Sequence, residues 1–312
     1  MQNFFTNLTI FSVIFLGWAL KKTGRLTSAG LKDLNAVLFL PLMPITFFSS
    51  ALGFNTALLT SWRFVWVVLG GFLVSTLVMC ASAVLRKGPK ERRAVSALCG
   101  IRPNCIFIGL PLITMWLGQQ GANVMLMYIA CAMPYFNTVP LICSLLVLNG
   151  HADFKSIGKA LIGTFTNPIL IGGMLGLLVG GMGWTPLIPQ WVMRVLKILG
   201  TTSTGLALMV IGASLVPENF VSDIKIAWPD MAMKLFVHPA IMMIALLLFP
   251  VENATMAHVI IVASALAPAF NSFVVAKGFG MDGDYAAMLI ASSTLVSIAT
   301  LLFWMSVVTH VF

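Results

Sequence analysis

Ten apolar runs of about 16 to 27 residues follow one another along this chain, and they limit the folds open to it. The runs lie near residues 5–20, 33–52, 64–85, 94–117, 122–148, 157–180, 190–215, 226–249, 253–276 and 285–311. A helix of about 20 residues crosses the hydrocarbon core of a bilayer, which is about 30 Å thick. Hydrophobic residues fill 59% of the 312 positions and charged residues only 9%, which is far from the composition of a soluble domain. The sequence therefore predicts an all-α polytopic membrane protein with ten transmembrane helices.

The net charge of +9 is placed unevenly among the predicted connections. Thirteen of the 18 basic residues lie in the odd-numbered connections: Lys21, Lys22, Arg25, Lys32, Arg86, Lys87, Lys90, Arg92, Arg93, Lys155, Lys159, Lys225 and Lys277. Cytoplasmic loops of membrane proteins carry an excess of Lys and Arg. We therefore expect a multi-pass protein of the plasma (inner) membrane with both termini on the extracytoplasmic side. Because topology explains the charge, no nucleic-acid partner is predicted.

Motifs for catalysis or metal binding do not occur in the sequence. It contains no HExxH, GxSxG or P-loop pattern, and its five cysteines lie inside predicted spans without a CxxC pair. The chain is therefore predicted not to be an enzyme, to bind no metal as a cofactor and to need no other cofactor. Coupling to Na⁺ or to H⁺ is left open.

The two halves of the chain, residues 1–150 and 151–312, repeat some of their glycines and prolines at identical spacing. The matching pairs are Gly17 and Gly24 with Gly176 and Gly183, and Pro103 and Gly118 with Pro268 and Gly283. Such pairs also arise by chance in glycine-rich membrane helices. Five spans in each half would make the second repeat inverted in the membrane. Inverted repeats with interrupted helices are typical of secondary transporters, whose binding site lies at the interruptions.

Prolines interrupt the fourth and ninth predicted spans at similar depth. Pro103 lies ten residues after Arg93, and Pro268 lies nine residues before Lys277. At a rise of about 1.5 Å per residue, each proline would lie about 14–15 Å inside the membrane, near its middle. We predict that the two broken helices cross there, because irregular backbone is tolerated in a bilayer only inside protein or beside a wet cavity.

Polar residues follow both breaks. Helix segments that begin near Asn104 and Asn271 would point their positive ends at the crossing, which suits an anion. Each asparagine either binds substrate or only caps its helix. Arg102 either clamps a carboxylate or is structural, for example by binding helix carbonyls. The sequence leaves both alternatives open.

The fifth span contains the segment PYFNTVP, from Pro134 to Pro140. We interpret this segment as a further interruption, with Asn137 as a candidate residue of the substrate site. The two prolines alternatively only kink a helix that packs around the crossing.

Acidic residues are absent from the middle of the predicted spans, so no carboxylate stands out as a proton carrier. Asp230, Lys234 and His238 are spaced four apart on one face of the eighth span. They are candidates for ion or proton coupling through a relay. An ion pair between positions four apart that anchors the helix near the cytoplasmic surface is the favoured alternative.

Two motifs resemble a known family. The segment RPNCIFIGLPLI, from Arg102 to Ile113, resembles the fourth-span signature of the auxin efflux carrier family. The segment APAFNSFVVAKGFG, from Ala267 to Gly280, is similar to that family's ninth-span pattern. The short fifth connection, about Asn149 to Ser156, resembles the bacterial branch of malate- and malonate-type carriers and not the plant carriers.

The resemblance implies a scaffold domain, a transport domain with crossed helices, and an organic-anion substrate such as auxin, malate or malonate. It also implies that Asn104 contacts a substrate carboxylate, whereas the role of Arg102 does not follow from the plant pattern. The expected function is secondary transport by alternating access. An anion channel or a non-transporting membrane sensor is the alternative. The expected partners are the anion, the lipid bilayer and, as a candidate assembly, a homodimer through the scaffold helices.

Overall fold

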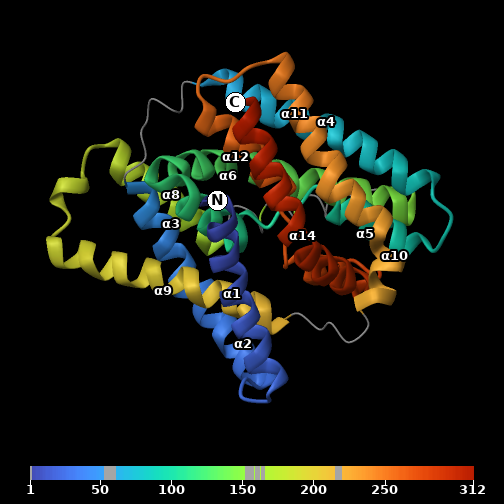
Figure 1. The fold of residues 1–312 in the computed structure, drawn as a ribbon, viewed down its shortest axis with the longest axis horizontal. Coiled ribbons are helices and arrows are strands. Elements are labelled where there is room, and N and C mark those ends of the chain that lie inside the picture. The colour runs from blue at the N-terminus through green and yellow to red at the C-terminus, as the bar shows by residue number, and fades with distance from the viewer. Residues whose placement is uncertain (1, 53–60, 152–157, 159–161, 163–165, 215–219) are drawn as a thin grey trace. The chain divides into compact units, whose positions relative to one another are not determined.

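The computed structural model describes residues 2–52, 61–151, 158, 162, 166–214 and 220–312 (Figure 1). The regular elements of this described part are helices. They form two compact units, each built from separate stretches of the chain. Unit 1 comprises residues 1–60, 106–127 and 163–216, and unit 2 comprises residues 61–105, 128–162 and 217–312. Each unit therefore draws residues from both halves of the sequence.

Unit 1 contains the N-terminal helices and the first helices after the middle of the chain. Its elements are α1 (Gln2–Lys22), α2 (Ser28–Val37), the π-helical turn η1 (Leu38–Leu42), α3 (Met43–Leu52), α8 (Pro168–Gly181), the short 3₁₀ helix η4 (Thr185–Leu187) and α9 (Gln190–Ser214). In this unit, α1 packs against α9, and α3 packs against α8 and α9.

Glycines let the backbones of unit 1 approach closely. A Cβ atom at Gly212 of α9 would overlap the carbonyl oxygen of Ile14 in α1, and one at Gly17 would overlap that of Met209. Small residues are used in this way at helix contacts in membranes. The contact between α1 and α9 therefore depends on glycine at both positions.

Unit 2 contains the remaining long helices. Its elements are α4 (Trp62–Leu85), α5 (Lys90–Cys99), α10 (Phe220–Ala232), the π-helical turn η5 (Met233–Val237), α11 (His238–Leu248), α12 (Ala254–Ala265), α13 (Ser272–Gly278) and α14 (Gly283–Val311). Two elements are divided between the units, η3 (Cys105–Gly109) and α6 (Leu110–Asn149). Cys105 belongs to unit 2 and residues 106–127 to unit 1, and α6 contributes residues 128–149 to unit 2. The C-terminal helix α14 contacts α10, α12 and α13, and α11 contacts both α4 and α12.

The helices confirm a polytopic membrane protein. In the described part of the chain, six helical stretches are long and apolar enough to cross a membrane, and α8 and α12 are shorter apolar helices. The six stretches are Ser28–Leu52, Trp62–Leu85, Cys105–Asn149, Gln190–Ser214, Ser222–Leu248 and Gly283–Val311. The predicted sixth span begins at residue 157, and most of residues 152–165 lie outside the described part, as does most of the predicted short connection before it. The number of ten spans stays a prediction.

The interpretation of PYFNTVP as an interruption is wrong. Helix α6 continues through Pro134 and Pro140, and the residue inside it with non-helical backbone angles is Gly118 (φ 64°, ψ −154°). A proline removes one helix hydrogen bond, but neighbouring groups in a membrane helix can satisfy the freed carbonyl. Asn137 therefore projects from a continuous helix.

Candidate functional site

Both predicted breaks are present in unit 2. Helix α5 ends at Cys99 and helical structure resumes with η3 at Cys105, while α12 ends at Ala265 and α13 begins at Ser272. Both α5 and α12 thus end before a proline, as expected because proline disfavours helical angles at the preceding residue. The chain between these helices is irregular.

The two irregular segments cross and pair through their backbones. Pro103 and Pro268 form an isolated antiparallel bridge. The Asn104 N–H donates to the carbonyl oxygen of Ala267 at 2.9 Å, and the Ala269 N–H donates to that of Arg102 at 2.7 Å. These two bonds satisfy backbone groups that neither helix can satisfy. The two broken segments therefore meet at their prolines, as the sequence predicted.

Arg102 lies buried at this crossing, with 3% of its surface exposed. Its Nη2 donates to the side-chain oxygen of Asn137 at 3.0 Å and to that of Asn271 at 3.4 Å. Its Nε is buried without a hydrogen-bond partner among the described residues. In that same part of the chain, no carboxylate forms an ion pair with Arg102. The arginine is therefore a desolvated cation that no anionic side chain in the described part neutralises.

The two predicted asparagines of the breaks differ in their surroundings. Asn104 is 4% exposed, whereas Asn271 is exposed. Asn271 occupies the N-cap position of α13 without a side-chain capping bond, and its side-chain oxygen faces Arg102 instead. Capping by the side chain therefore does not explain Asn271. The crossing brings Arg102, Asn104, Asn137 and Asn271 into one region of unit 2.

Asp230, Lys234 and His238, which are spaced four apart in the eighth predicted span, were expected to contact one another. The structure shows no such contact among them. Asp230 forms an ion pair with Arg86. Its carboxylate also accepts hydrogen bonds from the Ser96 hydroxyl at 2.6 Å and from the Tyr285 hydroxyl at 2.5 Å. The predicted ion pair between Asp230 and Lys234 is wrong, because Asp230 already has three donors from other elements.

Lys234 binds the end of a helix instead. It is 1% exposed, and its ammonium donates to the carbonyl oxygen of Ser264 at 2.7 Å. Ser264 lies in the last turn of α12, where carbonyls lack partners within the helix and carry a partial negative charge. This role of Lys234 was not among the predictions from the sequence, and the signal that could have revealed it is a lysine at mid-span opposite a predicted helix break.

His238 contacts a residue of a different helix. Its Nδ1 lies 2.8 Å from the hydroxyl oxygen of Ser75 in α4, and the ring is fully buried. Asp230, Lys234 and His238 thus reach three different elements, and these contacts do not form a continuous relay.

Chemically, the crossing can hold an anion. A buried guanidinium with an unpaired N–H, two amide side chains and interrupted helix ends form a set of hydrogen-bond donors around one place. Groups of three or more His, Cys, Asp or Glu side chains that could hold a metal ion are absent from the described residues. Helical membrane proteins with such crossed, broken helices are typically transporters.

Comparison with known proteins agrees with that class. The profile of a family described as "Membrane transport protein", the auxin efflux carrier family, matches residues 4–305. The chain therefore belongs to this family, and the protein is a membrane transporter. A relative from Rhizobium meliloti (strain 1021) is named "Putative malonate transporter". It is 22% identical over 302 residues, which cover 94% of this chain and 92% of the relative.

Proposed function

We propose that this protein is a secondary transporter that moves small organic anions by alternating access at the crossing of the two broken helices. The substrates are carboxylates, with dicarboxylates such as malonate or malate preferred. The observation that carries the proposal is the buried Arg102, which has no carboxylate partner among the described residues and an unpaired Nε–H.

An unpaired buried charge needs a physical reason. A desolvated ion costs several kcal/mol unless it is paired, so a chain that keeps one at a membrane site benefits from an anion that arrives there. A guanidinium can bind a carboxylate through two parallel N–H bonds. The relative named for malonate supports a substrate of this class.

The amide side chains at the crossing are the proposed ligands of a second carboxylate. A dicarboxylate has a second carboxylate, and the amide groups of Asn104 and Asn271 lie at the same crossing as Arg102, one from each break. Asn137 then orients the arginine from α6 through its side-chain oxygen. The substrate would replace the hydrogen bonds that it loses with water by bonds to these donors.

The proposed architecture is ten transmembrane helices in two inverted repeats, residues 1–150 and 151–312. Two observations support the repeat. Pro103 and Pro268 occupy equivalent positions in the bridge, and Gly24 and Gly183 both have left-handed backbone angles, with φ of 72° and 71°. Gly118 also has a positive φ, but its counterpart Gly283 does not. The proposal includes a scaffold domain that forms a homodimer, the inner membrane as location and both termini outside the cytoplasm.

We propose that transport is not coupled to proton movement through a relay of side chains. The carboxylate of Asp230 accepts from three donors, and the Nδ1 of His238 is hydrogen-bonded to Ser75 while its Nε2 is buried without a partner among the described residues, so the two side chains are not joined in a relay. Three modes of coupling are open: Na⁺ bound by unwound carbonyls, H⁺, and uniport driven by voltage. Measuring uptake under sodium, pH and voltage gradients imposed one at a time distinguishes them. Asp230→Asn and His238→Gln variants should keep the gradient dependence of the parent.

Counterflow in proteoliposomes tests the proposal. Vesicles loaded with unlabelled malonate should accumulate labelled malonate transiently above its external concentration, because a carrier exchanges one substrate for another. Monocarboxylates should compete less well than dicarboxylates. Flux that does not saturate and shows no counterflow would identify a channel, and binding without flux would identify a sensor.

A further inference from the structure

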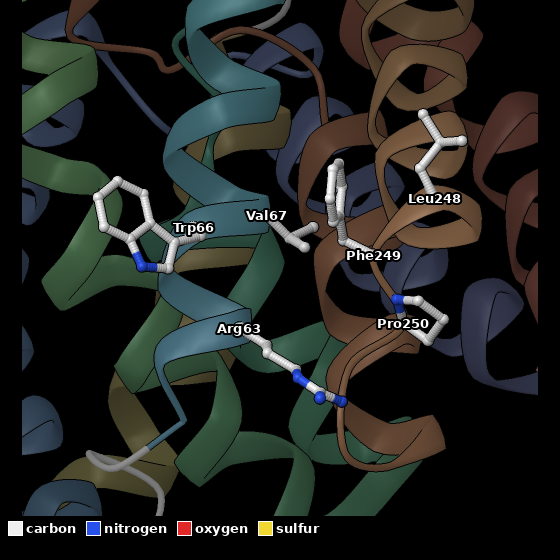
Figure 2. Close-up of a pocket in the computed structure, with 6 residues that line it drawn as sticks. All are labelled: Arg63, Trp66, Val67, Leu248, Phe249 and Pro250. Carbon is white, nitrogen blue, oxygen red and sulfur yellow. The ribbon is translucent and has the colours of Figure 1, made fainter.

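A groove runs along unit 2 between α4 and α11, away from the residues of the crossing. One part has a volume of about 630 Å³ and is lined by Arg63, Trp66, Val67, Leu248, Phe249 and Pro250. An adjoining part of about 420 Å³ shares four of these residues and extends along α4 to Val74 and along α11 to Ile241. Figure 2 shows Val67 and Phe249 facing each other between the two helices. The volume is in the range that holds a small ligand or a lipid chain.

The walls of the groove are apolar and accessible. Trp66, Leu248 and Phe249 are 72%, 68% and 65% exposed, and the adjoining part adds aliphatic side chains from both helices. Gly70 opens the wall of α4, because a Cβ atom added there would meet nothing within 4 Å. Both helices belong to stretches that are apolar enough to cross a membrane. The groove thus has the apolar composition of a lipid-facing surface.

The cationic side chain of Arg63 lies at one end of the groove. Arg63 lies in the first turn of α4, and its side chain extends toward the segment that holds Pro250 (Figure 2). It forms no ion pair with any described residue. The nearby carboxylate of Glu252 accepts a hydrogen bond from the Ser61 hydroxyl at 2.5 Å. The N-terminal end of α4 adds partial positive charge at the same place.

The length of the groove matches one leaflet of a bilayer. Eleven residues separate Arg63 from Val74 along α4, which corresponds to about 16 Å of helix. Half of a hydrocarbon core is about 15 Å thick. The groove has the length of one phospholipid acyl chain. Its apolar walls suit that chain, and its cationic end is complementary to the phosphate. A small dicarboxylate would leave most of these apolar walls uncovered.

We propose that the groove between α4 and α11 binds an anionic phospholipid. The phosphate lies against the Arg63 guanidinium and one acyl chain lies along Trp66, Gly70 and Val74. A lipid bound here would stabilise the contact between α4 and α11, both of which belong to unit 2 with the crossing. This site is independent of the substrate site, so its test does not depend on transport.

Quenching of tryptophan fluorescence tests the proposal on the full-length protein. The parent is placed in phosphatidylcholine vesicles that contain a minor fraction of brominated phosphatidylglycerol or, for comparison, brominated phosphatidylcholine. The signal of Trp66 is isolated by subtracting that of a Trp66→Phe variant. We expect stronger quenching of Trp66 by the anionic lipid, because bromine on its chain would lie in the groove.

Two substitutions with matched controls locate the site. Arg63→Gln should weaken the preference for phosphatidylglycerol about fivefold, the effect of one basic residue near a membrane surface. Arg194→Gln removes another exposed charge, in α9, and should not weaken that preference. Gly70→Leu should fill the groove and reduce quenching by both lipids as well as the phosphatidylglycerol that co-purifies. Gly205→Leu, at another glycine with open space around it, should not.

Equal quenching by both lipids, or a preference that survives both Arg63→Gln and Gly70→Leu, would overturn the proposal. So would a Trp66 that neither brominated lipid quenches, since protein, for example a second copy of the chain, would then cover the groove.

Discussion

Arg102 and Asn137 are joined by a hydrogen bond of 3.0 Å from the guanidinium Nη2 to the side-chain oxygen of the amide. The bond connects the break after α5 to the part of α6 that follows Gly118. It holds the arginine with a neutral acceptor, so the positive charge stays available to an anion. An acidic residue at position 137 would neutralise the same charge from within the protein.

Asn104→Ala should weaken substrate binding about tenfold to a hundredfold. A lost hydrogen bond to a charged group costs about 1.5–3 kcal/mol, and the backbone bond from Asn104 to Ala267 survives the change. Isothermal titration of purified protein with malonate measures the effect. Asn167→Ala removes an asparagine that caps α8 and serves as the control, with unchanged affinity expected. Unchanged binding by a folded Asn104→Ala protein would exclude this residue from the site.

Arg102→Lys should weaken dicarboxylates more than monocarboxylates. Lysine keeps the charge but loses the planar pair of donors that matches a carboxylate. Competition by unlabelled malonate and acetate against labelled substrate gives the two affinities in one assay. A purely structural arginine predicts a lower folded yield with the ratio of the two affinities unchanged, which is the contrary result.

Lys234→Met should leave the free energy of unfolding unchanged or raise it. Burying an ammonium costs several kcal/mol, and its hydrogen bond to Ser264 returns about 1.5–3 kcal/mol. Methionine retains an unbranched apolar chain in the same place. Lys234→Ala should instead lower stability by about 2–4 kcal/mol, because it removes that chain and leaves a cavity. Denaturant unfolding in detergent compares the two. If methionine destabilises as much as alanine, the bond to Ser264 outweighs the cost of burial.

Gly212→Ala should destabilise the packing of α1 against α9 by about 1–3 kcal/mol. The added methyl group would meet the carbonyl of Ile14, which the backbone of α1 must move to avoid. Gly205→Ala, in the same helix with open space around it, should be neutral or slightly stabilising. Thermal unfolding of the two purified variants measures the difference. Equal melting temperatures would show that α1 and α9 shift at little cost.

Local signals predicted much of the architecture. The lengths of the apolar runs anticipated helices such as α4, α9 and α14 to within a few residues, because hydrocarbon thickness sets the length of a spanning helix. The breaks at Pro103 and Pro268 could also be predicted, since proline has no N–H to donate. The same rule failed at Pro134 and Pro140, where α6 continues. Proline alone does not reveal whether neighbouring groups will satisfy the freed carbonyl.

The sequence by itself determined the class of the protein, the places where its helices break and the presence of a cation at one break. These properties depend on residue type and on spacing along one segment. Only the tertiary structure decided the partners. Arg102 meets Asn271 across 169 residues of chain, and Lys234 meets Ser264 across 30. Asp230 binds Arg86 and not its neighbour in the helix. A hydrogen bond requires two groups within about 3 Å of each other, and the folding of distant segments sets that distance.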